Sequence, residues 1–361
     1  MKLSELKAQY NLLLKELARE QCVLLIGPEI LRVNGVCFQQ KLQQELQASL
    51  SEKIPFYYPK DALFVFKDDM SKAYVQGNVV DYLDEINTNT RAEDQPDETI
   101  FKKIAALPFH LIISVNPDHF LSDTFAKYGV RHRFGYFHHS GSGVADIEDP
   151  HDYMPLIYNL FGSKEKDASL VLDYDDLFNL LQTLLGKPGL PTKLDTKLKE
   201  AKSFLFLGFR FDRWYSQLLL RLLAGKQAIR KYAFEPPPDA DTSAFLVRQM
   251  DITFLGSDLR HFEFLYKFCK ESHRLRDLVE IQNPTARAIF QMMQMGDTGR
   301  AMKTVGDFFK GTPSEMDATQ LQARFAIWEK NQSLRLVSDG DAQIELNKII
   351  YATLQLVNAV K

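Results

Sequence analysis

The run Val23-Leu24-Leu25-Ile26-Gly27-Pro28-Glu29 joins four consecutive apolar residues to a turn that begins with glycine. An uninterrupted apolar run of this length is typical of a parallel strand that is buried on both faces of a sheet. Similar runs occupy residues 111–115, 156–160, 203–207 and 252–256, and helical patterns lie between several of them. The alternation predicts an α/β fold with a doubly wound, mainly parallel sheet of the Rossmann type.

Two regions interrupt this alternation. Residues 36–100 carry a mostly helical pattern with polar breaks, which predicts a helical insertion over the sheet. Residues 129–155 are rich in His, Gly, Ser and Asp, which predicts a mobile surface loop.

The pattern becomes entirely helical after Asn283-Pro284. Apolar residues recur at helical spacing around residues 289–293, 321–328 and 346–357, and turn-forming residues lie at 311–313 and 338–341. We therefore expect one α/β domain over residues 1–283 and a small all-helical domain over residues 284–361. A bundle of this size gains stability from docking or self-association.

The composition narrows the class of protein. There are 44 basic and 47 acidic residues among 361, and this weakly acidic balance argues against nucleic acid as a partner. The three cysteines, Cys22, Cys37 and Cys269, show no metal-ligand spacing, so we expect reduced thiols and no metal site. Neither a signal peptide nor an apolar run long enough to span a bilayer is evident, which predicts a cytoplasmic protein without a membrane partner.

Glycine and polar residues cluster where the expected strands end. The carboxyl ends of parallel strands meet at one edge of the sheet, where such folds bind ligands. Each of these residues also has an ordinary explanation, because Asn116 and Asp118 are common turn formers and Asp212 can cap a helix. The candidate binding residues at this edge are Gly27, Pro28, Glu29, Asn116, Asp118, Phe161, Gly162, Ser163, Gly208, Phe209 and Asp212, with Arg210 as a further polar lining candidate.

The four segments that end at Glu29, Asp118, Ser163 and Asp212 resemble, in their order and approximate spacing, the NAD-binding domains of sirtuin-like proteins. The resemblance extends from residue 20 to about residue 265. It implies a pocket that takes NAD as substrate or ligand and needs no metal. It also implies that the Gly27 turn approaches the diphosphate and that the segment from Gly208 to Asp212 holds the adenosine half.

The resemblance further implies a catalytic role for Asn116, which would order the ribose and the attacking water. Asp118 would shape the nicotinamide side of the pocket. Three departures from the family pattern are evident: Pro28 removes a backbone donor, Glu29 adds a carboxylate beside the diphosphate, and Phe161 replaces the histidine base. Phenylalanine cannot accept a proton, and His138, His139 and His151 are better read as surface histidines than as substitutes.

Two functions stay open at this point. The chain is either an NAD glycohydrolase that yields nicotinamide and ADP-ribose, or a catalytically degenerate scaffold or nucleotide sensor. Protein deacetylation is disfavoured, because the zinc cysteines and the histidine of that branch are both missing.

The C-terminal helical segment resembles the effector-associated domains of bacterial conflict systems, through residues 318–325, 337–339 and 345–350. This resemblance implies an antiviral defence effector that forms a homo-oligomer or recruits a partner through a homotypic helical domain. The alternative is a structural cap packed on the sheet.

Overall fold

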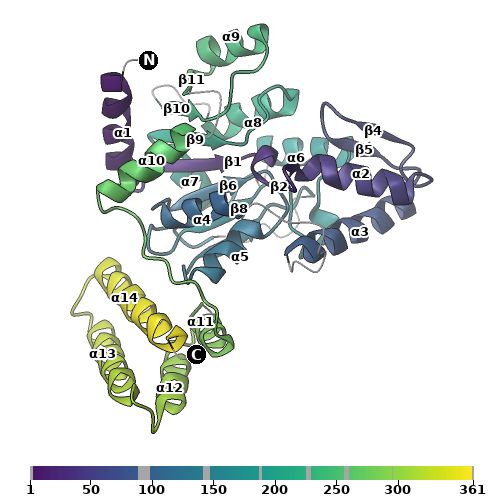
Figure 1. Cartoon of the computed structure of the whole chain (residues 1–361). Helices are drawn as coiled ribbons and strands as arrows, with labels where there is room; N and C mark the ends of the chain where they lie inside the picture. The colour runs from purple at the N-terminus through teal and green to yellow at the C-terminus, as the bar shows by residue number, and fades with distance from the viewer. Residues whose placement is uncertain are drawn as a thin grey trace.

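The structure is a computed structural model that describes residues 3–87, 98–140, 147–186, 189–224, 229–255, 260–294 and 296–359. Within these ranges, seven strands form one parallel sheet in the order β11-β10-β9-β1-β6-β8-β7 (Figure 1). The strands are β1 (Cys22–Ile26), β6 (Leu111–Ser114), β7 (Arg133–Tyr136), β8 (Leu156–Asn159), β9 (Ser203–Leu207), β10 (Arg230–Ala233) and β11 (Ile252–Phe254).

Helices cover both faces of this sheet. Successive residues of β1 alternate between two hydrophobic clusters, with Leu24 in one and Val23 in the other. Helices α1 to α5 and α10 contribute to the first cluster and α6 to α9 to the second. The helices are α1 (Leu3–Leu17), α2 (Phe38–Leu50), α3 (Asp69–Asn87), α4 (Thr99–Ala106), α5 (Phe120–Lys127), α6 (Tyr174–Leu185), α7 (Thr192–Glu200), α8 (Trp214–Ala224), α9 (Ala240–Gln249) and α10 (Arg260–Glu271). The predicted doubly wound α/β fold is confirmed.

The direction of winding reverses beside β1. The chain passes from β1 to β6 and β8 on one side, and then returns to β9 on the other side. In doubly wound sheets, ligands bind outside the carboxyl ends of the strands at such a switch point. The crevice between β1 and β9 is therefore the expected site.

The described residues between 36 and 100 lie outside the main sheet, and they contain α2 and α3. Short antiparallel pairs accompany these helices: β2 (Arg32–Val33) with β3 (Val36–Cys37), and β4 (Phe56–Tyr58) with β5 (Leu63–Val65). The Gly27 turn continues into the 3-10 helix η1 (Pro28–Ile30), and η2 (Asp167–Ser169) follows β8.

The prediction of a loop over residues 129–155 is wrong in part. Residues of β7 pair with β8 and form an edge of the sheet. This edge strand is only half-buried, so it contains arginine and glycine and does not form an apolar run in the sequence. Residues 141–146 of the expected loop lie outside the described residues.

The C-terminal region consists of α11 (Pro284–Gln294), α12 (Thr298–Phe309), α13 (Glu315–Ser333) and α14 (Asp339–Asn358), and Figure 1 shows these helices beside the sheet region. The apolar stripes that the sequence shows meet in a third hydrophobic cluster. Ser338 caps α14 by accepting a hydrogen bond from the Asp341 amide at 3.2 Å.

The helical region contacts the sheet region around the end of α5. The amide of Ile281 donates to the carbonyl of Lys127 at 2.7 Å, and the side-chain amide of Asn347 on α14 donates to the Tyr153 carbonyl at 2.9 Å. Gly129 adopts a positive φ of 66°, and an added Cβ would lie 2.8 Å from a methyl of Leu354. Helix α14 thus packs closely on the turn that follows α5.

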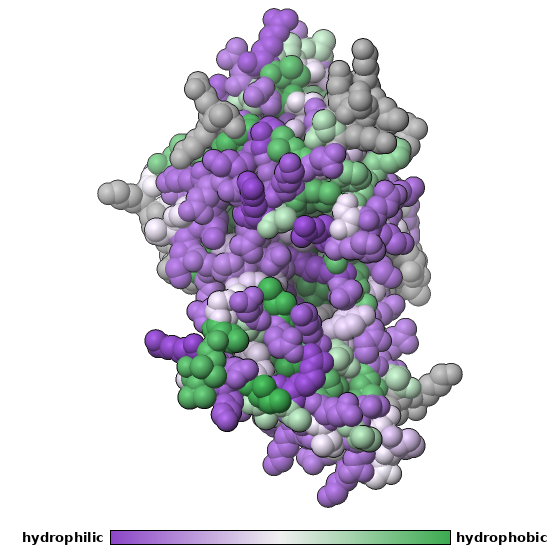
Figure 2. Space-filling view, turned by 90° about the vertical axis from the view of Figure 1, so that its left-hand side faces the viewer, coloured by the Kyte–Doolittle hydropathy of each residue, from purple (hydrophilic) through white to green (hydrophobic). Residues whose placement is uncertain are grey.

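Other apolar side chains of the helical region face solvent. Met316 and Ile327 on α13 and Leu336 in the following turn are 72%, 61% and 66% exposed. Figure 2 shows hydrophobic patches on the lower part of the molecule, which the C-terminal helices form. None of the helices in the described ranges combines the length and hydrophobicity needed to cross a bilayer.

Candidate functional site

The turns after β1 and β9 touch backbone to backbone. An added Cβ on Gly27 would lie 2.1 Å from the carbonyl oxygen of Gly208, so only glycine fits there. The Gly27 amide donates to the Leu207 carbonyl at 2.9 Å, and the Glu29 amide donates to the Gly208 carbonyl at 3.0 Å. Pro28 has no amide hydrogen. The turn therefore offers no amide from Gly27, Pro28 or Glu29 to an incoming phosphate.

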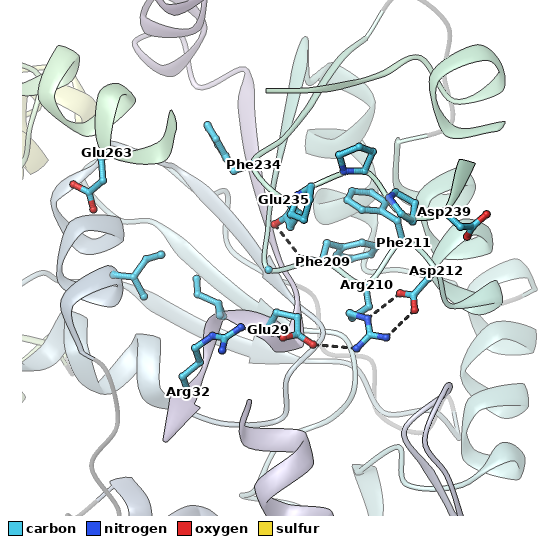
Figure 3. A pocket seen from close by; sticks show the side chains of 16 residues that line it. Glu29, Arg32, Phe209, Arg210, Phe211, Asp212, Phe234, Glu235, Asp239 and Glu263 are labelled. Carbon is cyan, nitrogen blue, oxygen red and sulfur yellow. Dashed lines mark hydrogen bonds and ion pairs between the residues drawn. The ribbon is translucent and has the colours of Figure 1, made fainter. Parts of the chain in front are cut away.

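Charged side chains lie in front of this turn instead. Arg210 donates to both carboxylate oxygens of Asp212, at 2.8 and 2.7 Å, and to Glu29 at 3.1 Å. The second oxygen of Glu29 lies 3.4 Å from Arg32. The bond from Arg210 lowers the pKa of Asp212, so the carboxylate remains ionised. Figure 3 shows Arg210 between the two carboxylates.

A cavity of about 1070 Å³ opens beside this network. It lies at the carboxyl ends of β1, β9 and β10, and Figure 3 shows its lining. The wall combines aromatic side chains, three consecutive prolines and five carboxylates. Its residues are Glu29, Ile30, Arg32, Ile100, Gly208, Phe209, Arg210, Phe211, Asp212, Phe234, Glu235, Pro236, Pro237, Pro238, Asp239 and Glu263.

Glu235 is the most unusual group in this cavity. Its Oε1 accepts a hydrogen bond from the Phe209 amide at 3.2 Å, whereas Oε2 is buried and has no partner among the described residues. Burial raises the pKa of Glu235 to about 8. A buried carboxyl with an unused oxygen can accept a hydrogen bond from a ligand hydroxyl or, when protonated, donate one. The sequence analysis did not single out Glu235.

Asn116 and Asp118 lie after β6, next to the Gly27 turn. The side-chain amide of Asn116 donates to the Gly27 carbonyl at 3.2 Å and so joins the ends of β6 and β1. Asp118 accepts from the Phe120 amide at 3.0 Å, and its Oδ2 is buried without a partner among the described residues. Burial raises the pKa of Asp118 to about 6.

Comparisons with known protein families agree with this arrangement. A family model described as a SIR2-like domain matches residues 110–255, and effector-associated domain 11 matches residues 284–361. The chain combines a SIR2-like domain with an effector-associated domain. The first match covers β6 to β11 and leaves out β1, whose turn carries Pro28 and Glu29. A comparison with curated proteins found no match.

Phe161 replaces the expected base within the SIR2-like domain. Its side chain is 7% exposed and packs on Tyr215, with ring centroids 6.0 Å apart. Gly162 has a φ of 88°, and an added Cβ would lie 2.1 Å from the Ser169 carbonyl oxygen. Phe161 therefore packs against α8, and Gly162 packs against η2.

Ser163 is fully buried and hydrogen-bonded to a histidine that the sequence analysis missed. His119 Nε2 lies 2.8 Å from the Ser163 hydroxyl, and His119 Nδ1 lies 3.9 Å from a carboxylate oxygen of Glu165. Burial lowers the pKa of His119 to about 4, so the ring is neutral at pH 7. His119 directly follows Asp118 in the sequence, and this position beside a predicted site residue was the signal that could have identified it.

The three histidines named from the sequence have other partners. His151 lies 3.0 Å from Glu20, and both residues precede strands, at the amino edge of the sheet and away from the candidate site. His139 is buried rather than on the surface, and its Nε2 lies 2.9 Å from the Ala168 carbonyl. His138 lies 3.0 Å from the Ser140 hydroxyl.

The candidate residues of the SIR2-like domain thus fall into two groups. Glu29, Gly208, Phe209 and Asp212 line the large cavity, and Gly27 and Pro28 form the turn behind it. The second group is Asn116, Asp118, Phe161, Gly162 and Ser163, which is buried and does not line that cavity. Within the described part of the chain, no three His, Cys, Asp or Glu side chains are grouped to hold a metal ion.

Proposed function

We propose that this chain is an NAD-directed effector of a bacterial antiviral defence system. In this proposal residues 1–283 form the domain that binds NAD in the cytoplasm, and residues 284–361 bring chains or partner proteins together. The observation that carries the proposal is the large cavity at the switch point of a SIR2-like domain, with a buried, unsatisfied Glu235 oxygen in its wall. A family that binds NAD places its ligand at this edge of the sheet.

The adenosine half of NAD would occupy the cavity, with ribose hydroxyls against Glu235. The diphosphate would be held by side chains, because the amides of the Gly27 turn are already bonded. Arg210 and Arg32 are the nearest cations, and Glu29 now occupies them. A diphosphate would replace the Glu29 carboxylate on these guanidinium groups.

The proposed reaction is hydrolysis of the nicotinamide–ribose bond. The water oxygen bonds to C1′ of the ribose, the bond from C1′ to the nicotinamide nitrogen breaks, and one proton is released. Asn116 would orient the ribose and water, and Asp118 would face the nicotinamide. Since Asn116 donates to the Gly27 carbonyl, its amide oxygen and its second hydrogen are the groups left for this task.

A second function, nucleotide sensing without cleavage, is favoured by one specific observation. The resemblance aligns Phe161 with the family base, and this residue is buried against Tyr215 and cannot accept a proton. In that case NAD binding would change how the effector-associated domain engages a partner.

Calorimetric titration with NAD, together with a fluorescent assay of NAD cleavage, tests both functions. Binding and cleavage that Asn116→Ala abolishes would support the hydrolase. Binding without cleavage, in the assembled protein as well, would support the sensor. No binding at about 1 mM NAD, a Kd that corresponds to only about −4 kcal/mol, would contradict both.

The role of the effector-associated domain has a separate test. Removing residues 284–361 should convert an assembly into smaller species on size-exclusion chromatography with light scattering. An unchanged mass would contradict the recruitment role.

A further inference from the structure

A second cavity, of about 550 Å³, adjoins the first. It lies between the β2–β3 hairpin, the first turns of α2 and the segment that leads into α8. The two cavities share Glu29, Arg32 and Arg210 as a common wall. Three arginines and one glutamate are the charged residues that line this second cavity, so its charge is positive.

Arg213, the third of these arginines, is buried and forms no ion pair with a carboxylate of the described residues. Arg213 is only 4% exposed. Nη1 donates to the Tyr215 hydroxyl at 2.9 Å and Nη2 to the Gln39 amide oxygen at 2.8 Å. The Nε of Arg213 is buried with no partner, and no carboxylate of the described residues pairs with this guanidinium.

This situation is energetically costly. A buried charge is normally paired, because an unpaired one loses its hydration without a compensating partner. The neighbouring Arg210 shows the usual solution, because Glu29 and Asp212 both bind it. Asp61, which is close to Tyr215, uses its carboxylate to accept from Tyr174 and only its carbonyl to accept from Tyr215.

The N-terminus of α2 faces the same cavity. This helix has 13 residues, and the side chain of Cys37 at its N-cap position accepts no capping hydrogen bond. Gln39 and Gln40 in the first turn line the cavity. The first turn of a helix carries partial positive charge and favours anions. The helix end and the buried Arg213 therefore favour the same kind of ligand.

We propose that this second cavity binds a phosphoryl group of a small-molecule ligand, with Arg213 as its fixed cationic partner and the first turn of α2 as a second donor. Arginine suits this role because its planar donors match phosphate oxygens in pairs. The phosphoryl group is either part of the NAD diphosphate, reaching across the shared wall, or belongs to a separate phosphorylated ligand. Both sources place the same anion on Arg213, and the site does not depend on NAD being hydrolysed.

The first test is calorimetric titration of the full chain with inorganic pyrophosphate. We expect the wild type to bind and Arg213→Gln to bind about tenfold more weakly or worse, a loss of at least about 1.4 kcal/mol. Arg221→Gln is the matched control, because Arg221 is an exposed arginine of the adjoining helix α8 and should leave binding unchanged. Absence of binding to the wild type at about 10 mM, or equal binding by Arg213→Gln, would overturn the proposal.

A second variant keeps the test decisive if Arg213→Gln does not fold. Gln39→Glu places a carboxylate where Arg213 already donates, so it supplies an internal counter-ion. We expect this variant to melt at a higher temperature and to lose pyrophosphate binding. Gln47→Glu makes the same charge change on α2 away from the lining and should do neither. Unaltered pyrophosphate binding by Gln39→Glu would refute the assigned site.

Repeating the titration with NAD present identifies the source of the phosphoryl group. Competition assigns the site to the diphosphate of NAD, and simultaneous binding assigns it to a separate ligand. Glu235→Gln separates the two proposals, because it should weaken NAD binding and leave pyrophosphate on Arg213 unaffected.

Discussion

Replacing Glu235 by glutamine removes the one buried carboxyl of the large cavity whose pKa is raised far above its ordinary value. Burial raises that pKa from 4.5 to about 8. Between these two values the folded protein holds a proton that the unfolded chain releases, so the wild type loses stability as the pH rises from about 4.5 to about 8. Glutamine carries no such proton, and the variant should not show this loss.

The size of the effect follows from the shift. A shift of 3.5 pKa units at 1.36 kcal/mol per unit gives an upper limit of about 5 kcal/mol. The residue is half-buried, and Oε1 keeps its bond from the Phe209 amide, so we expect about 2 kcal/mol. Glu235→Gln should therefore match the wild type near pH 5 and exceed it by about 2 kcal/mol at pH 8.5.

Urea unfolding at pH 5, 7 and 8.5 measures this difference directly. Glu263→Gln is the matched control, because Glu263 lines the same cavity but is bonded to Lys103 and half-exposed. A stability difference between Glu235→Gln and wild type that stays constant across this pH range would refute the reasoning. The same variant should bind NAD about tenfold more weakly at pH 8.5, where Glu235 is mostly ionised, because hydrogen bonds to a charged group are worth about 1.5–3 kcal/mol.

Three further substitutions test the packing. Gly27→Ala should lower the free energy of unfolding by about 3 kcal/mol, because the new Cβ would meet the Gly208 backbone, which cannot move away cheaply. Gly77→Ala in α3 should raise it by about 0.5–1 kcal/mol, because nothing lies within 4 Å of its new Cβ. Trp328→Phe should lower it by about 1 kcal/mol, because the indole donates to the Ala342 carbonyl at 2.6 Å and phenylalanine cannot. Urea unfolding checks all three, and a Gly27→Ala protein as stable as the wild type would contradict the backbone contact.

The sheet could be predicted where a strand is buried on both faces. The apolar runs at β1, β6, β8 and β9 leave no alternative to a central strand, and the structure has each of them. The edge strand β7 could not be found in this way, because its residues are half-exposed and include Gly135. Its place depends on pairing with β8, which is information about the tertiary structure.

The candidate site was predicted only in outline. The strand ends indicate where a ligand binds. The ion pairs, hydrogen bonds and pKa of each side chain at the site, however, depend on residues that are distant in the sequence. Glu29 and Arg210 are 181 positions apart in the sequence, and their ion pair cannot be read from either segment. The pKa of Glu235 depends on burial by the surrounding structure. The amides of Gly27 and Glu29 donate to the carbonyls of Leu207 and Gly208, at the end of β9, and not to a partner nearby in the sequence.

Helix α5 lies between the end of β6 and the contact with the C-terminal region. It begins immediately after Asp118 and His119 and ends at Lys127, whose carbonyl accepts from Ile281 of the segment leading to the C-terminal helices. Eight helical residues make a rigid strut about 12 Å long. Because α14 packs on the turn at Gly129, this one helix spans the distance between that contact and the end of β6.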